Sequence, residues 1–164
     1  MPRPSITPHA PFPMEKYPMP AKVLFTAGYE GRVQDELLDG LVAAGARVLL
    51  DIRAVPLSRK PGFSKRMLAA SAEARGIRYV HLQPLGTPKP GRDAARSGRA
   101  AEMERIFAAH MATQPALAAL AAARDIVTST PTCLLCFERD PHFCHRRIVA
   151  DMLSAQTRQA IEHL

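Results

Sequence analysis

The feature that most constrains the fold of this chain is the alternation of short apolar runs with longer segments of helical periodicity. Strands are predicted over residues 22–27, 47–53, 77–82 and 132–138. Helical patterns separate or follow them, over residues 33–44, 64–75, 100–124 and 144–155. Strands that alternate with helices form a parallel sheet with helices packed on its faces. We therefore predict an α/β fold, with a mostly parallel sheet flanked by helices in a Rossmann-like three-layer arrangement.

Local signals mark the boundaries of several elements. The first two predicted helices end at Gly45 and Gly76, since glycine commonly follows the last turn of a helix. Ser64 is expected to be the N-cap residue of the second helix. The segment 84–99 is rich in proline and glycine and is predicted to be a loop.

The first 20 residues contain seven prolines, which lack the amide donor that regular structure needs. We expect residues 1–20 to be an extended or disordered leader and residues 21–164 to be a single α/β domain. The leader lacks the apolar stretch of a secretory signal, and no apolar run approaches the roughly 18 residues of a membrane span. Three cysteines without an export signal favour reduced thiols, so we expect a cytoplasmic protein without a membrane partner.

The net charge of +7 is concentrated in two places. The first cluster consists of Arg53, Arg59, Lys60, Lys65 and Arg66, and the second of Lys89, Arg92, Arg96 and Arg99. Basic clusters bind phosphate groups, but they also occur on ordinary solvated faces. If the clusters are functional, a nucleotide or a nucleic acid is the expected partner.

The carboxyl ends of parallel strands share one edge, and ligands of such sheets bind there. Gly28 and Tyr29 follow the first strand and could either offer amide donors to an anion or form a plain turn. Asp51 and Arg53 follow the second strand and should lie on one face. Arg53 either neutralises the Asp51 carboxylate or is oriented by it toward an anion.

The last loop carries the residues with the richest chemistry. Cys136 and Glu138 share a face at the end of the fourth strand. Cys144, His145 and Arg146 fall at the start of the following helix, where the helix dipole and a neighbouring cation lower a thiol pKa. These residues predict a cysteine nucleophile with Glu138 or His145 moving protons. Alternatively, Cys144 packs as a small buried hydrophobe.

A metal site is the competing interpretation of this loop, because Cys133, Cys136, Cys144 and His145 are four potential zinc ligands. The geometry of a strand argues against it, since Cys133 and Cys136 would project to opposite faces. We therefore expect no metal ion and no cofactor.

Several of these motifs resemble family 488 of the domains of unknown function. The motifs that carry the resemblance are Thr26 to Gly31, Asp51 to Arg53 with Pro56 and Ser58, Phe63 to Lys65, Tyr79 to Leu82, Leu85-Gly86, and Leu135 to Glu138 followed by Cys144 to Arg146. The resemblance implies an α/β sheet domain but no activity. It also marks Gly28, Tyr29, Asp51, Arg53, Cys136, Glu138, Cys144, His145 and Arg146 as family positions.

Three functions follow from these patterns. The first is an enzyme acting on a phosphate-bearing substrate, in which Arg53 and Arg146 hold the anion and Cys136 or Cys144 is the nucleophile. The second is a binding module for a nucleotide or nucleic acid that uses the basic clusters without turnover. The third is a sulfur transferase similar to rhodaneses, which Glu138 and Asp140 disfavour because they would repel a persulfide anion.

Overall fold

Within the part of the chain that the structure describes, five parallel strands form the central sheet. A computed structural model describes residues 23–164, so the predicted proline-rich leader lies outside the described residues. The strands are β1 (Val23–Gly28), β2 (Val48–Asp51), β3 (Arg78–His81), β4 (Thr132–Cys136) and β5 (Ala160–His163). They are ordered β3-β2-β4-β1-β5, and every neighbouring pair is parallel. The predicted parallel sheet is therefore confirmed.

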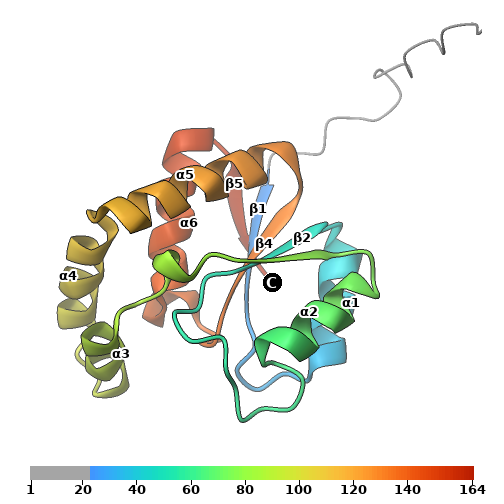
Figure 1. Ribbon diagram of the computed structural model, residues 1–164, viewed down its shortest axis with the longest axis horizontal. Helices are drawn as coiled ribbons and strands as arrows, with labels where there is room; N and C mark the ends of the chain where they lie inside the picture. Colours follow the sequence, from blue (N-terminus) through green and yellow to red (C-terminus); the bar gives the residue numbers. More distant parts are fainter. Residues whose placement is uncertain (1–22) are drawn as a thin grey trace, which may run out of the picture.

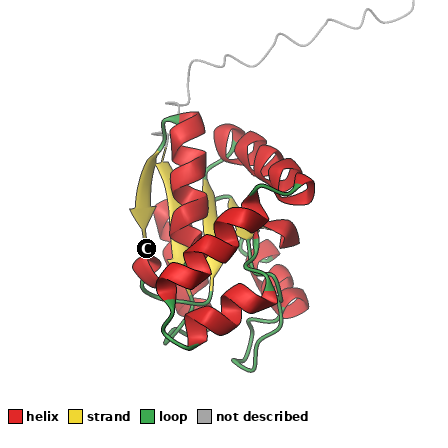
Figure 2. Ribbon diagram, turned by 90° about the vertical axis from the view of Figure 1, so that its left-hand side faces the viewer, coloured by secondary structure: helices red, strands yellow, loops and turns green. Residues whose placement is uncertain are grey.

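Helices cover both faces of this sheet (Figures 1 and 2). They are α1 (Gln34–Ala44), α2 (Lys65–Glu73), α3 (Lys89–Arg96), α4 (Ala100–Met111), α5 (Gln114–Ser129) and α6 (His145–Thr157), with short 3₁₀ turns η2 (Gln83–Leu85) and η3 (Pro141–Phe143). Leucines of α1 and α2 pack on one face of the sheet, in a core that includes Cys133. The other face packs against α3 to α6, in a core that includes Leu134.

Within the described part of the chain, no single helix is long and apolar enough to cross a membrane. The α4 and α5 pair reaches the required length and composition only when the two helices are taken together, and they are bent by 85° at their junction.

Two elements differ from the sequence-based predictions. The segment 84–99 is not only a loop, because α3 occupies its second half with Pro90 in the first helical turn. Proline is tolerated there since the first amides of a helix have no intrahelical partner. Strand β5 was not predicted, because its four residues form a short edge strand without an apolar run.

Of the predicted helix boundaries, Gly45 behaves as expected and Ser64 only in part. Gly45 adopts the left-handed conformation after α1, with φ of 84°, as expected. Ser64 does precede α2, but its side chain makes no capping hydrogen bond within the helix. Its hydroxyl instead donates a hydrogen bond to the carbonyl of Ser58 and accepts one from the Ser58 amide. These two bonds fix the conformation of the loop after β2.

The strand order places β4 between β1 and β2. Cys136 is in register with Gly28 of β1, and Leu135 is in register with Asp51 of β2. The loops that follow these three strands therefore leave the same short stretch of the sheet edge. This arrangement brings the predicted site residues together from three distant parts of the sequence.

Candidate thiol site at the carboxyl edge of the sheet

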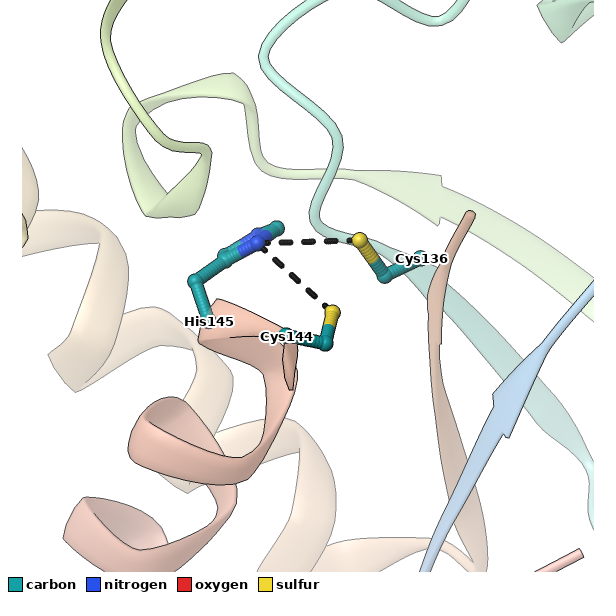
Figure 3. Close-up of side chains that lie close together, drawn as sticks. All are labelled: Cys136, Cys144 and His145. Carbon is teal, nitrogen blue, oxygen red and sulfur yellow. Dashed lines mark hydrogen bonds between the residues drawn. The ribbon is translucent and has the colours of Figure 1, made fainter. Parts of the chain in front are cut away.

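Two cysteines and one histidine form the centre of the site (Figure 3). Cys136 is the last residue of β4, Cys144 is the N-cap residue of α6, and His145 is the first residue of that helix. The Nδ1 atom of His145 lies 3.6 Å from Sγ of Cys136 and 3.8 Å from Sγ of Cys144. All three side chains are buried.

The orientation of the His145 ring is fixed from its other side. Its Nε2 lies 3.1 Å from the carbonyl oxygen of Ile52, and that acceptor requires a proton on Nε2. The ring also meets Phe107 edge to face, with centroids 5.3 Å apart. Nδ1 therefore faces the sulfurs, where it either accepts a thiol proton or, in the imidazolium form, donates to a thiolate.

The surroundings of Cys136 favour its thiolate. Burial alone would raise the pKa of the Cys136 thiol, but hydrogen bonds from Cys144 and the charge of His145 hold that pKa well below its usual range. Burial likewise would lower the pKa of His145, but the Cys136 thiolate raises it. Burial and the neighbouring Cys136 thiolate keep the pKa of Cys144 well above its usual range. These shifts favour a Cys136 thiolate beside a His145 imidazolium, and they favour the neutral thiol of Cys144.

Glu138 supplies an acid next to the thiolate. Its Oε2 lies 3.1 Å from Sγ of Cys136. Burial and the negative charge of Cys136 raise the pKa of Glu138 to about 7. The carboxyl group is thus partly protonated at neutral pH and can donate a proton to a reacting group beside the sulfur.

The two remaining cysteines have different surroundings. Cys144 Sγ accepts a hydrogen bond from the backbone amide of Arg146 at 3.4 Å, so the thiol caps the helix as well as filling space. Cys133 lies in the core on the opposite face of the sheet, as strand alternation predicts. Burial raises the pKa of Cys133 to about 12.

Asp51 and Arg53 form a buried ion pair beside this centre. Arg53 donates from Nη2 to Oδ2 of Asp51 at 2.6 Å and from Nε to Oδ1 at 2.9 Å. Its Nη1 donates to the Tyr29 hydroxyl and to the Phe63 carbonyl, and Tyr79 donates its hydroxyl to Asp51. Although burial opposes it, the Asp51 carboxylate raises the pKa of Arg53. Most of the Arg53 donors are thus engaged within the protein, which favours the neutralising role over anion binding.

Arg146 is also held by the protein itself. Its side chain is 1% exposed and donates to Thr26 Oγ1 at 3.1 Å and to the Glu138 carbonyl at 2.7 Å. The same carbonyl explains why residue 28 is a glycine, since a Cβ atom at Gly28 would lie 1.8 Å from the Glu138 oxygen. Gly28 therefore allows two loops to approach closely, and no anion contact is needed to account for it.

A cavity of about 660 Å³ opens above the centre. Five predicted site residues line it: Tyr29, Arg53, Cys136, Glu138 and His145. Three arginines that were not assigned to the site, Arg59, Arg92 and Arg96, line it as well. Among residues 23–164, Glu138 is the only acidic residue that lines the cavity. These three arginines belong to the two basic clusters that the sequence shows. Only the fold reveals that residues of both clusters line one cavity.

Together, the parallel sheet and the thiol site at its carboxyl edge define the protein as an α/β domain with a cysteine- and histidine-containing cavity. The model of the family described as Domain of unknown function DUF488 matches residues 34–153. The chain belongs to this family, which confirms the resemblance; the motif from Thr26 to Gly31 lies before the matched range. No curated protein and no solved structure matches the chain.

Proposed function

We propose that this protein is an enzyme that acts on a phosphate-bearing substrate, such as a nucleotide or a nucleic-acid end, with Cys136 as its nucleophile. The observation that carries the proposal is the position of the Cys136 sulfur. It lies within hydrogen-bond reach of both an imidazole and a carboxyl group, at the base of a cavity lined by arginines. A buried cysteine with a purely structural role needs none of these neighbours.

The side chains divide the chemistry among themselves. The Cys136 thiolate attacks phosphorus and displaces the leaving oxygen, which takes the proton of Glu138. Water then attacks the cysteinyl phosphate, and the Glu138 carboxylate accepts a proton from that water. The His145 imidazolium stabilises the thiolate before the attack and again as it is released.

The charge of the cavity matches an anionic substrate. Arg92 donates a hydrogen bond from Nη1 to the Thr87 carbonyl. This bond holds the Arg92 side chain against the cavity wall. Arg59 has no ion-pair partner among the described residues, and Arg96 shares Asp93 with Lys89. We assign phosphate binding to Arg59, Arg92 and Arg96, because Arg53 and Arg146 direct their donors to protein groups.

The test is release of inorganic phosphate from a panel of nucleotides and of oligonucleotides phosphorylated at either end, under reducing conditions. Turnover should disappear in Cys136→Ser and persist in Cys133→Ser, a matched change of a buried cysteine on the other face. Quenching with a denaturant at alkaline pH should trap a phosphate adduct on Cys136, visible by mass spectrometry. Full turnover by Cys136→Ser would refute the mechanism.

The arginine-lined cavity also favours a second candidate, a module that binds nucleotides without reaction. The same panel separates the two functions. Binding without phosphate release, unchanged in Cys136→Ser but weakened by loss of Arg92, would establish the module and reject the enzyme.

A further inference from the structure

We propose that Cys136, Cys144 and His145 form a binding site for a thiophilic divalent metal ion such as Zn²⁺. The site would have three protein ligands and a fourth position that opens on the cavity. This inference does not depend on the proposed function, because it rests on the positions of three side chains and not on turnover.

The distances among the three donor atoms suit one tetrahedral ion. Zinc binds thiolate sulfur at about 2.3 Å and imidazole nitrogen at about 2.0–2.1 Å. Tetrahedral angles then require about 3.6 Å between sulfur and nitrogen and about 3.8 Å between two sulfurs. The observed separations from Nδ1 are 3.6 Å to Cys136 and 3.8 Å to Cys144, and all three donor atoms lie within 4.8 Å of one another.

Groups around the donors hold them in a ligating orientation. The Ile52 carbonyl accepts Nε2–H of His145, which leaves the Nδ1 lone pair of the neutral ring for an ion. A backbone carbonyl in this position is a common partner of metal-binding histidines, since it fixes both tautomer and ring orientation. The Arg146 amide similarly bonds Sγ of Cys144.

Charge and access are also suitable. Two thiolates would neutralise a divalent ion, so the buried complex would carry no net charge. Cys136 and His145 line the cavity, and so does Glu138, which places the open coordination position on that side. Three protein ligands with an open position are typical of sites where a metal ion meets a small molecule.

The fold also explains why the four-ligand zinc site considered from sequence does not form. Cys133 points into the core on the opposite face of β4, so it takes no part. Strand alternation points Cys133 away from the site. The other two proposed ligands are Cys144 and His145, which come from the start of α6 and not from β4.

A bound ion would change the chemistry of the site. It would take the Cys136 sulfur as a ligand and suppress its reaction with phosphorus, so metal loading should inhibit the proposed enzyme. The metal-free protein and the metal-bound protein are then two functional forms of one site.

The experiment uses the full chain, reduced and freed of metal by a chelator that is then removed, and titrated anaerobically with Co²⁺. We expect saturation at one equivalent, with sulfur-to-cobalt charge-transfer absorption and intense visible bands of four-coordinate cobalt. Zn²⁺ should then displace the cobalt and abolish the spectrum. Cys133→Ser should bind as the wild type does.

The ligand variants give a graded result. Cys144→Ser should lose about half of the charge-transfer intensity, and both it and His145→Gln should bind at least about tenfold more weakly. Circular dichroism identifies any variant that fails to fold.

Several results would overturn the site. They are no binding by the wild type, weak six-coordinate bands alone, full binding by folded Cys144→Ser, or loss of binding in Cys133→Ser. The two proposals fail separately. A cobalt spectrum without phosphate release from any substrate removes the enzyme alone, and release without a cobalt spectrum removes the metal site alone.

Discussion

Arg146 donates a hydrogen bond from Nη1 to the carbonyl oxygen of Glu138 at 2.7 Å. This bond connects the first turn of α6 to the loop after β4, so it sets the position of His145 relative to Cys136. The arginine is almost fully buried, and its Nε bonds Thr26 of β1. A single side chain thus holds together three of the segments that build the site.

Replacing Arg146 with glutamine should therefore destabilise the fold. The shorter side chain cannot reach all of its acceptors, and buried carbonyls without a donor lower the unfolding free energy by about 2–4 kcal/mol in total. Urea denaturation measures this change. The neighbouring variant Arg147→Gln is the control, since its ion pairs are on the surface and should contribute less than about 1 kcal/mol. Equal losses in the two variants would contradict the structural role of Arg146.

Gly28→Ala should displace the loop that carries Glu138. The added methyl group would overlap the Glu138 carbonyl, and such overpacking costs about 1–3 kcal/mol. Gly40→Ala in α1 is the matched control, because nothing lies within 4 Å of its new methyl group. That control should stabilise the protein by up to about 1 kcal/mol. Thermal unfolding of both variants tests the difference, and a neutral Gly28→Ala would show that the loop yields easily.

Alkylation should select Cys136 among the three cysteines. Its thiolate persists below the usual thiol pKa, whereas the pKa values of Cys133 and Cys144 are raised. Peptide mapping after brief iodoacetamide treatment at pH 7 should find Cys136 modified first. His145→Asn should slow this reaction by about tenfold, because loss of the neighbouring positive charge raises the Cys136 pKa and lowers the thiolate fraction at pH 7. Preferential labelling of Cys144 would reverse our assignment of thiolate and thiol.

Glu138→Gln should change the pH dependence of stability in a defined direction. The pKa of Glu138 is about 7 in the folded protein and about 4.3 in an unfolded chain, so the folded state binds more protons between these values. The contribution of Glu138 to the unfolding free energy therefore falls as pH rises from about 4.3 to about 7. The variant lacks this loss, so its unfolding free energy should improve relative to the wild type across that window. A constant difference between the two proteins would disprove the raised pKa.

Removal of the cavity arginines should weaken binding of an anionic probe such as pyrophosphate. Each charge-assisted hydrogen bond that is lost should raise Kd by about tenfold. Isothermal titration of Arg59→Ala, Arg92→Ala and Arg96→Ala measures the effect, with Arg124→Ala on α5 as a control outside the cavity. Unchanged affinity in all three cavity variants would place the anion elsewhere.

The sequence predicted the sheet well because its strands are buried and its periodicity is strong. All four residues of β2 are buried, and the apolar run from Val48 to Leu50 is visible without a structure. The short edge strand β5 has no such signal, because three of its four residues are exposed. Helix α3 was missed for a different reason. Its prolines are typical of a loop, but here they stand at the start of the helix.

The site was predictable in composition but not in the roles of its residues. Alternation along β4 correctly separates Cys133 from Cys136, and the helix-start signal correctly locates Cys144 and His145. The partners of the two buried arginines depend on distant carbonyls, such as that of Phe63 for Arg53, which no local pattern reveals. Likewise, Arg59 in the loop after β2 and Arg92 in α3 line one cavity only because β2 and β3 are neighbours in the sheet.

The strand order has a consequence for biosynthesis. Because β4 separates β1 from β2, a nascent chain that ends before residue 132 can pair β2 with β3 but cannot join β1 to either. Until β4 leaves the ribosome, the flanks of β1 and β2 remain open to wrong partners, including the same strands of neighbouring nascent chains. The last major strand to be translated is therefore the one that closes the fold, and the site around Cys136 cannot assemble before it arrives.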